Sequence, residues 1–457
     1  MTPITCFKAY DLRGRIPSEL NDEVAYRVAR GYAQFLNPKR IVVGRDIRLS
    51  SASLTDAVCR GLTDSGVDVY DCGVCGTEGV YFATFDGGYD GGIMITASHN
   101  PPDYNGMKFV RAQSRPISGD NGLQQIRALA ERGDFPAPAR PGVRRSIDTM
   151  PAYIAHLLSY VEAATLKPLK IVVNAGNGGA GLIIDRLEPH VPFRFVKVHH
   201  EPDGQFPNGI PNPMIEENRA PTIEAIRRHG ADLGLAWDGD FDRCFFFDEQ
   251  GRFIEGYYIV GLLASVLLRG HPAGKVVHDP RLTWNTIEVV KASGGLPVLS
   301  KSGHAFIKER MREVDGVYGG EMSAHHYFQR FAYCDSGMIP WLIVAQLLGE
   351  SGQPLSALVD ERMALFPVSG ELNYRVPDAR STLAAFEARY APQAIVLDRT
   401  DGVSFEFKEW RFNLRTSNTE PLIRLNVEAR GSVDLLRART RELWEVLQSQ
   451  GAVAADH

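Results

Sequence analysis

A serine beside a histidine and an asparagine is the first group of residues in this chain that could carry chemistry. It stands in the stretch Thr96-Ala97-Ser98-His99-Asn100-Pro101, directly after the apolar run Gly92-Ile93-Met94-Ile95. This order is typical of a buried strand that delivers a hydroxyl group into a loop. The sequence therefore predicts that the hydroxyl of Ser98 is placed to carry a covalent group.

A cluster of acidic residues forms the second chemical signal. In Trp237-Asp238-Gly239-Asp240-Phe241-Asp242-Arg243, carboxylates alternate with other residues directly after an expected strand. Carboxylates this close repel one another unless a cation lies between them, and hard divalent cations prefer oxygen ligands. Asp238, Asp240 and Asp242 are therefore interpreted as ligands of Mg²⁺.

Two other interpretations of the acidic cluster are less favoured. An EF-hand calcium loop would place Asp238, Asp240, Asp242 and Glu249 at ligand positions, but it needs glycine where this chain has Arg243. An acidic turn on the protein surface is also common, but the apolar strands expected on both sides argue against it. Mg²⁺ remains the favoured ion.

Three further loops contain polar residues suited to a phosphorylated sugar. In Gly319–His326, Glu321 and Ser323 would point the same way on an extended segment and suit two neighbouring sugar hydroxyls, although from these residues alone a capped turn is the favoured interpretation. The segment Arg415–Pro421 combines a guanidinium with short hydroxyl donors, which suits a phosphate, and a polar hairpin loop is its alternative. Lys301–His304, taken alone, is interpreted as structural.

Two motifs suggest other activities. Gly176–Gly181 matches the glycine pattern of a dinucleotide site, with Glu201 further on, so a nicotinamide-dependent oxidoreductase stays an alternative. A glycine-rich turn between a strand and a helix is weak support for it. Cys72 and Cys75 have redox or zinc-ligand spacing, but no second pair matches them, and reduced cysteines in a turn are expected.

Composition limits the class of protein. The chain has 457 residues, 23% charged and 44% hydrophobic, with a formal net charge of −5, which describes a globular protein and gives no reason to expect nucleic acid or a membrane as partner. Its length fits roughly three or four domains. The first residues show no signal peptide, and the apolar runs are shorter than the roughly 18 residues of a membrane span, so a cytoplasmic protein is expected.

Strands and helices alternate along most of the chain, which predicts α/β domains with mixed sheets. We expect domain 1 at residues 1–150, domain 2 at 151–253 and domain 3 at 254–366, with a linker near 136–142. From about Pro367 the alternation becomes typical of antiparallel strands, which predicts a smaller α+β domain at 367–457. The predicted elements include strands 40–44, 67–71, 91–96, 170–174, 231–237, 275–278, 316–318, 403–407 and 422–427, and helices 51–64, capped by serine and threonine, and 433–448.

Four of these stretches occur in the order and spacing of the α-D-phosphohexomutase superfamily: Thr96–Pro101, Asp238–Arg243, Gly320–His325 and Arg415–Thr419. The chain resembles its bacterial phosphomannomutase/phosphoglucomutase branch over nearly its whole length, and Phe7–Gly14 matches as well. The resemblance implies four domains around a central cleft, an intramolecular phosphotransferase activity, and a monomer.

The resemblance also implies roles for individual residues. Ser98 would be the phosphoserine and, with Asp238, Asp240 and Asp242, would bind Mg²⁺. Glu321 and Ser323 would hold the sugar hydroxyls O3 and O4. A phosphate would be held by Arg415, Ser417, Asn418 and Thr419. Other matched cleft positions are Tyr10, Arg13, Lys108, Arg243, His304 and His325, and Arg281 stands at the position of a cleft lysine. Lys108 is the first candidate for the general base and His325 the second.

The chain departs from the family pattern at a few positions. Phe241 and Ala324 stand where the family usually has glycine, and Arg281 stands where relatives often have lysine. If position 241 needs a positive φ, phenylalanine would cost roughly 1–2 kcal/mol there. Met322 is the residue type typical of the mannose/glucose branch at this position.

The expected reaction is the reversible conversion of hexose 1-phosphate to hexose 6-phosphate, for glucose and mannose, through phosphoserine and a 1,6-bisphosphohexose. Glucose 1,6-bisphosphate would be activator and intermediate, and the products would supply sugar nucleotide precursors for exopolysaccharide or lipopolysaccharide synthesis. A phosphosugar-binding protein with a decayed site and a phosphosugar hydrolase are the alternatives from other classes.

Overall fold

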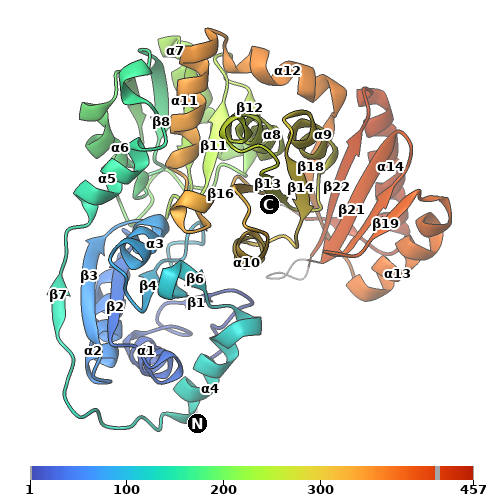
Figure 1. The fold of residues 1–457 in the computed structure, drawn as a ribbon. Helices are drawn as coiled ribbons and strands as arrows, with labels where there is room; N and C mark the ends of the chain where they lie inside the picture. The colour runs from blue at the N-terminus through green and yellow to red at the C-terminus, as the bar shows by residue number, and fades with distance from the viewer. Residues whose placement is uncertain (1–2, 417–421, 456–457) are drawn as a thin grey trace. The chain divides into compact units, whose positions relative to one another are not determined.

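The computed structural model describes residues 3–416 and 422–455, coloured along the chain in Figure 1. The predicted site residues Ser417, Asn418 and Thr419 lie outside this range. The chain divides into two compact units, and each is described by itself. Unit 1 comprises Met1–Phe253 and Arg330–Gly352, and unit 2 comprises Ile254–Gln329 and Gln353–His457.

The first sheet of unit 1 is mixed and has the strand order β1-β5-β4-β2-β3-β7, with β6 paired to β5. Its central strands are buried and apolar because helices cover the sheet. Its strands are β1 (Leu12–Arg15), β2 (Arg40–Arg45), β3 (Asp68–Val74), β4 (Gly91–Ile95), β5 (Tyr104–Arg111), β6 (Arg115–Pro116) and β7 (Arg144–Ser146). Its helices are α1 (Asp22–Leu36), α2 (Ser51–Thr63), α3 (Thr77–Asp86) and α4 (Gln124–Arg132).

The second sheet of unit 1 has the order β12-β11-β10-β8-β9, with β8 parallel to both β9 and β10 and β11 antiparallel to β10. Its strands are β8 (Lys170–Asn174), β9 (Arg194–Val198), β10 (Leu233–Trp237), β11 (Cys244–Phe247) and β12 (Phe253–Ile254). Unit 1 also contains α5 (Met150–Leu158), α6 (Ala180–Leu187), α7 (Ala220–His229), β17 (Cys334–Asp335) and α11 (Ile339–Ser351).

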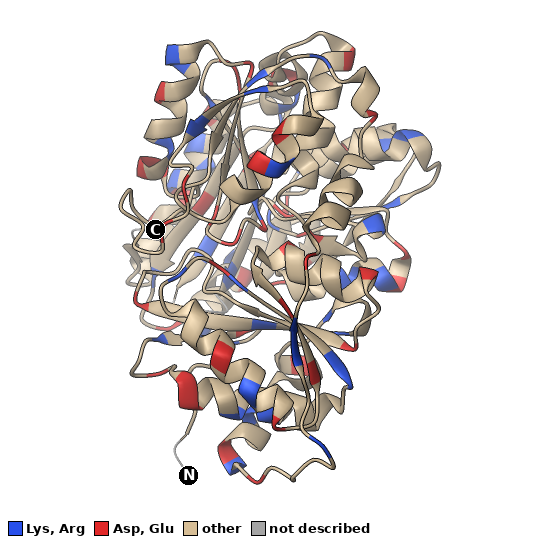
Figure 2. Cartoon of the chain, turned by 90° about the vertical axis from the view of Figure 1, so that its left-hand side faces the viewer, with Lys and Arg blue, Asp and Glu red and all other residues tan. Residues whose placement is uncertain are grey.

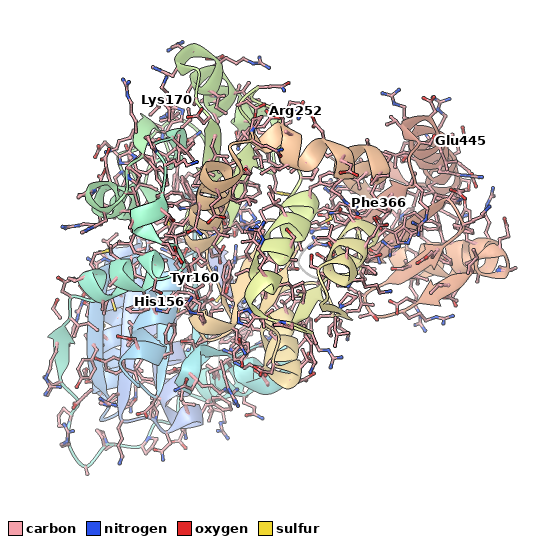
Figure 3. All side chains as sticks on the ribbon, turned by 45° about the horizontal axis from the view of Figure 1, so that its top comes forward. His156, Tyr160, Lys170, Arg252, Phe366 and Glu445 are labelled. Atoms are coloured by element: carbon pink, nitrogen blue, oxygen red, sulfur yellow. The ribbon has the colours of Figure 1, made fainter. Side chains whose placement is uncertain are left out.

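Aromatic side chains join the two sheets' helices within unit 1. His156 and Tyr160, labelled in Figure 3, pack together with ring centroids 5.6 Å apart. His156 also contacts Phe82 and Phe85 of α3. Ring contacts of this kind contribute to packing beyond their area burial. These contacts connect α5, the first helix after the linker, to α3, a helix of the sheet that carries the serine loop.

Unit 2 begins with a sheet in which β14 and β15 both lie parallel to β13 and β16 lies antiparallel to β15. These strands are β13 (Lys275–His278), β14 (Leu296–Leu299), β15 (Tyr318–Gly320) and β16 (His326–Phe328). The accompanying helices are α8 (Gly256–Leu267), α9 (Trp284–Ala292), α10 (His304–Val314) and α12 (Leu355–Leu365).

The last part of unit 2 is an antiparallel sheet with the order β19-β20-β21-β22-β18-β23. Its strands are β18 (Val368–Arg375), β19 (Val396–Asp398), β20 (Val403–Glu406), β21 (Trp410–Thr416), β22 (Ile423–Ala429) and β23 (Val453–Ala454), and its helices are α13 (Ala379–Tyr390) and α14 (Val433–Ser449). Apolar side chains of β20, β21 and β22 pack with Phe386 and Leu443 of the two helices. The sequence prediction of an α+β fold here is confirmed.

The predicted α/β class and the predicted strands are confirmed, with ends that differ by a few residues. The expected side-chain cap of α2 is not made, because Ser50 at its N-cap has helical backbone angles and Ser51 bonds Asp46 instead. All six cysteines, including Cys72 and Cys75, are free thiols. Acidic and basic residues are interspersed along the chain (Figure 2). Within the described residues, no helix has the length and apolar character needed to cross a membrane.

Candidate active site

The loop after β4 carries Ser98 in a strained and buried position. Ser98 has φ of 48°, a left-handed conformation that is uncommon for residues other than glycine. Its backbone N–H donates to Oγ1 of Thr96 over 2.9 Å, and the residue is almost fully buried. Strained backbone persists only where the surroundings hold it.

Arg48, which the sequence analysis did not single out, binds the backbone of this loop. Its buried guanidinium donates to the carbonyl oxygens of Ser98 (2.8 Å), Asn100 (2.5 Å), Pro101 (2.7 Å) and Tyr104 (3.0 Å). Arg48 therefore satisfies backbone acceptors of the serine loop that burial would otherwise leave without partners.

The acidic loop lies between β10 and β11, whose ends Trp237 and Cys244 pair directly. Asp238, Asp240 and Asp242 are buried, and one carboxylate oxygen from each lies within 4.8 Å of the others. The Ser98 hydroxyl donates to Oδ2 of Asp238 over 2.7 Å. The structure thus brings the predicted nucleophile and the predicted metal ligands together.

Two glycines let the serine loop and the acidic loop approach closely. A Cβ at Gly239 would clash with the carbonyl oxygen of Ser98. A Cβ at Gly178 would lie 2.9 Å from the carbonyl oxygen of Gly239. Gly178 belongs to the glycine-rich turn that suggested a dinucleotide site. Its glycine is explained by this close backbone approach, without a bound cofactor.

Phe241 has φ of 48°, so the strain considered for this position is present. Its fully buried ring packs where a Cβ at Gly76 or at Gly179 would otherwise lie. Ala324 has φ of 68°, so the second position where the family usually has glycine is also left-handed. Burial of the Phe241 ring offsets the backbone strain.

Lys108 lies on β5 and pairs with two carboxylates of the acidic triad. Its Nζ is 2.7 Å from Oδ2 of Asp240 and 2.5 Å from Oδ2 of Asp242, and it donates to Oγ1 of Thr77 at the start of α3 over 3.2 Å. Burial acts to lower the pKa of Lys108, but the two aspartates outweigh it and raise this pKa above its ordinary value. The ammonium form is therefore favoured.

Two arginines complete the serine site. Arg243 donates from Nε to Oδ2 of Asp238 (3.0 Å) and from Nη2 to the Ser98 hydroxyl (3.4 Å). Arg13, at the start of β1, donates to the Ala97 carbonyl (3.2 Å) and to Oδ1 of Asn100 (2.5 Å). Arg243 therefore places a guanidinium group beside the hydroxyl, where a phosphoryl group would need it, and Arg13 binds other residues of the same loop.

The Ser98 hydroxyl also lies 3.1 Å from Nδ1 of His99, the same nitrogen that Arg243 contacts. Burial and the charges of Arg243 and Arg13 lower the pKa of His99. Because the Ser98 hydroxyl donates directly to Asp238, a serine–histidine–aspartate relay is not formed. Tyr10 lies in the loop just before β1.

The acidic triad suits a hard divalent cation. Within the part of the chain that the structure describes, Oδ1 of buried Asp240 has no hydrogen-bond partner. A buried carboxylate oxygen without a partner is costly, and a metal ion is one group that satisfies it. Asp238, Asp240, Asp242 and the Ser98 oxygen therefore form an oxygen donor set of the kind that Mg²⁺ prefers.

Unit 2 contains the second set of predicted residues. Glu321 and Ser323 follow β15, and Nη2 of Arg281 lies 3.3 Å from an oxygen of each. His325 Nδ1 is 3.3 Å from Oε2 of Glu321 and 3.5 Å from the Ser323 hydroxyl. Burial acts to raise the pKa of Glu321, but His325 and Arg281 outweigh it and lower this pKa, so the carboxylate is ionised.

The loop before α10 contacts the same carboxylate. Gly303 has φ of 114°, which favours glycine, and its N–H donates to Oε1 of Glu321 over 2.8 Å. His304 is the first residue of α10 and lies 3.5 Å from Nζ of Lys308. The loop 301–304, interpreted as structural from the sequence, therefore supports Glu321 directly.

Arg415, at the end of β21, pairs with a carboxylate that the sequence analysis missed. Its Nη2 donates to Oε2 of Glu371 on β18 over 2.9 Å. Arg424 (3.1 Å) and Arg281 (3.4 Å) contact the same carboxylate. Burial acts to raise the pKa of Glu371, but the three arginines outweigh it and lower this pKa to about 2.

Asp279 is another residue that the sequence analysis missed. It follows β13 directly, and its Oδ2 accepts from Arg281 over 2.8 Å and from the N–H of Met322 over 3.1 Å. Asp46 after β2 and Asp238 after β10 occupy corresponding positions. Functional groups of α/β sheets gather at the carboxyl ends of strands, and this rule could have identified Asp46 and Asp279.

Comparison with protein families gives four matches in chain order. The phosphoglucomutase/phosphomannomutase models match residues 5–137 (alpha/beta/alpha domain I), 151–251 (domain II), 255–366 (domain III) and 371–443 (C-terminal domain). Together these matches cover most of the chain.

Individual relatives match over nearly their whole length. A phosphomannomutase of Salmonella montevideo is 59% identical over 456 residues, covering 98% of this chain and 100% of the relative. A protein named phosphohexose mutases from Xanthomonas campestris is 59% identical over 445 residues, covering 97% and 99%. A crystal structure of a phosphoglucomutase/phosphomannomutase family protein from Burkholderia thailandensis has a TM-score of 0.90 and 31% identity, covering 99% and 100% of the two chains.

Proposed function

The chain belongs to the phosphoglucomutase/phosphomannomutase family of phosphohexomutase enzymes, and on this basis we propose that it interconverts hexose 1-phosphates and hexose 6-phosphates through a phosphoserine at Ser98. The observation that carries the proposal is the 2.7 Å hydrogen bond from the Ser98 hydroxyl to Asp238, within a buried aspartate triad. It favours phosphoryl transfer over acyl transfer, because the triad could hold a divalent cation beside Ser98 and phosphoryl transfer needs such charge neutralisation.

In the proposed first step, the phosphorus–oxygen bond of phosphoserine breaks as a free sugar hydroxyl forms a new bond to the phosphorus. The hydroxyl loses its proton to a base, and the Ser98 oxygen remains beside Asp238 and Arg243. The resulting 1,6-bisphosphohexose turns around and returns its other phosphoryl group to Ser98. Mg²⁺ held by Asp238, Asp240 and Asp242 would neutralise negative charge on the group being transferred.

Lys108 is our first candidate for the base that accepts the hydroxyl proton, and His325 is the second. Asp240 and Asp242 favour the protonated form of Lys108, which opposes this role until those contacts change. Glu321 contacts His325 and would likewise favour its charged form. The experiment compares the single-turnover rate of phosphoryl transfer in Lys108→Gln and His325→Gln. The variant with the larger fall in this rate identifies the base.

Sugar recognition is assigned to unit 2. Glu321 and Ser323 would hold O3 and O4, with Arg281, His304 and His325 beside them. Tyr10 and Arg13 would contact substrate from unit 1. Arg415, with Ser417, Asn418 and Thr419, would hold the phosphate that is not reacting. Because O2 is not contacted in this scheme, glucose and mannose phosphates would both be substrates.

We further propose that glucose 1,6-bisphosphate activates the enzyme by phosphorylating Ser98. A monomer in the cytoplasm that supplies sugar nucleotide precursors for exopolysaccharide or lipopolysaccharide synthesis is the corresponding cellular role. The four-domain division at residues 150, 253 and 366 stays a prediction.

The direct experiment treats the protein with glucose 1,6-bisphosphate and measures its intact mass. We expect one added phosphoryl group, located at Ser98 by peptide mapping, together with isomerisation of both hexose 1-phosphates. Ser98→Ala should keep its circular dichroism spectrum but lose the phosphoryl group and nearly all turnover, whereas Ser53→Ala, an exposed serine on α2, should behave as wild type. Inorganic phosphate released at the rate of sugar conversion would instead show a hydrolase.

A further inference from the structure

Glu371 occupies the centre of a cluster of positive charge in unit 2. One carboxylate oxygen lies 2.9 Å from Nη2 of Arg415 and 3.4 Å from Nη1 of Arg281, and the other lies 3.1 Å from Nη1 of Arg424. The side chains of Glu371, Arg415 and Arg281 are all more than nine-tenths buried. A buried carboxylate is therefore shared among three guanidinium groups.

The strand register of the antiparallel sheet brings this carboxylate to Arg415 and Arg424. Arg415 on β21 and Arg424 on β22 are directly paired across the strands, an arrangement of like charges that is unfavourable without an anion. Glu371 on β18 pairs with Asn426, two residues along from Arg424 and hence on the same face. An irregularity between Val368 and Glu371, with Gly370 at φ of 69°, sets this register.

The charges of the cluster are already balanced within the protein. Arg281 also contacts Asp279 and Glu321, so three arginines face three carboxylates. A phosphate dianion added to this set would leave an excess of negative charge in a buried site, which is costly. Within the described residues, Nε of buried Arg415 has no hydrogen-bond partner, so Arg415 retains a donor for a further anion.

We propose that Glu371 is an internal counter-anion that competes with the substrate phosphate for Arg415. This inference rests on the proposed function, which assigns the non-reacting phosphate to Arg415. In the absence of phosphate, the carboxylate neutralises Arg415 and Arg424. Phosphate binding weakens or breaks the Glu371–Arg415 ion pair, and release of phosphate restores it.

The competition matters for an enzyme that must let its intermediate turn around. Each catalytic cycle requires the phosphate to leave Arg415 and the opposite end of the bisphosphate to bind there. A site that binds phosphate too tightly would stabilise the bound intermediate and slow this exchange without helping the transition state. Glu371 would keep phosphate affinity moderate, and it is a positioning residue because it acts through Arg415.

The test compares full-length wild type with Glu371→Gln and with Glu409→Gln, which removes an exposed glutamate charge from the turn between β20 and β21 of the same domain. Isothermal titration calorimetry with inorganic phosphate gives Kd, and steady-state kinetics with glucose 1-phosphate give kcat and KM. We expect Glu371→Gln to bind phosphate about tenfold more tightly, because phosphate no longer competes with the Glu371 carboxylate for one charge-assisted contact to Arg415. KM should fall, and kcat should fall with it.

Glu371→Asp provides a second test if the first variant is poorly folded. Its carboxylate keeps the charge but is withdrawn from Arg415 by one methylene, so phosphate affinity should lie between those of wild type and Glu371→Gln. General structural damage would weaken phosphate binding instead. Unchanged or weaker phosphate binding in folded Glu371→Gln, relative to both wild type and Glu409→Gln, overturns the proposal.

Failure of this inference is distinguishable from failure of the proposed function. If wild type isomerises hexose phosphates but Glu371→Gln does not bind phosphate more tightly, only the role of Glu371 is wrong. If Glu371→Gln binds phosphate more tightly while wild type has no mutase activity, the anion competition holds and the proposed reaction is wrong.

Discussion

The hydroxyl of Ser98 donates a 2.7 Å hydrogen bond to Oδ2 of Asp238, a residue 140 positions later in the chain. This contact joins the ends of strands from two different sheets of unit 1, β4 and β10. It places the proposed phosphoserine at an anionic site, which is unfavourable for a phosphoryl group unless a cation is present. The strongest consequences for experiment therefore concern the cation and the backbone that holds the serine.

Asp240→Asn should weaken the response to Mg²⁺ and the activity together. The substitution removes one ionised ligand from the triad, while Asp238 and Asp242 remain. Turnover measured against Mg²⁺ concentration should show a higher half-saturating concentration and a lower maximum. Asp120→Asn, an exposed acidic residue of unit 1, is the matched control. An unchanged Mg²⁺ dependence in Asp240→Asn would remove this residue from the metal site.

Arg48→Lys should impair catalysis through the position of Ser98. A lysine ammonium cannot reach the four carbonyl oxygens that Arg48 contacts, so acceptors in the serine loop lose their donors. The expected loss is about 1–3 kcal/mol of folding stability. We also expect slower phosphorylation of Ser98 by glucose 1,6-bisphosphate, followed by mass spectrometry, with KM for the sugar phosphate little changed.

Arg60→Lys on α2 serves as the control for Arg48→Lys, since Arg60 is exposed. If Arg48→Lys loses stability but phosphorylates Ser98 at the wild-type rate, then Arg48 is needed for folding and not for placing the hydroxyl.

Phe241→Gly should destabilise the protein even though it relieves a left-handed backbone. Relief of the strain at φ of 48° is worth roughly 1–2 kcal/mol, whereas removing a buried phenylalanine ring costs about 3–5 kcal/mol. Chemical denaturation should therefore show a net loss. Ala324→Gly, where only a methyl group is lost at φ of 68°, is the comparison and should cost far less. A more stable Phe241→Gly would show that the ring is poorly packed.

Acid should destabilise the protein partly through Glu371. Its pKa in the folded protein is about 2, below the ordinary value of 4.5, so the unfolded chain binds more protons between these values. The contribution of Glu371 to stability is thus fully present above about pH 4.5 and is lost as the pH falls toward 2. Glu371→Gln should show a smaller decrease in melting temperature between about pH 5 and pH 3 than wild type. Equal decreases would mean that the arginines do not hold the carboxylate ionised.

The sequence was most informative where functional groups are adjacent along the chain. Ser98 and the triad of Asp238, Asp240 and Asp242 each stand in one short loop, and their types indicated a covalently carried group and a metal ion, while the phosphate followed from the family resemblance. The main strands were predicted as well, because buried parallel strands are short apolar runs bounded by glycine and polar residues.

Arg48 and Glu371 could not be identified in the same way. Each is a single charged residue whose partners lie far away in sequence: Arg48 contacts residues about 50 positions later, and Glu371 contacts Arg415 44 positions later. A lone charged residue near a strand has no local signature, because exposed arginines and glutamates are common at such positions. Their roles depend on burial, which only the folded chain determines.

A Cβ at Gly239 would overlap the carbonyl oxygen of Ser98, and a Cβ at Gly178 would lie 2.9 Å from the carbonyl oxygen of Gly239, so backbone lies close to backbone at both glycines. Backbone groups therefore set the separation between Ser98 and the acidic loop. These groups have far fewer alternative conformations than side chains have rotamers. Even one added methyl group at Gly239 would clash with the Ser98 carbonyl oxygen and force the two loops apart. Evolution or design could change other residues of this enzyme while the spacing between Ser98 and the acidic loop stays fixed.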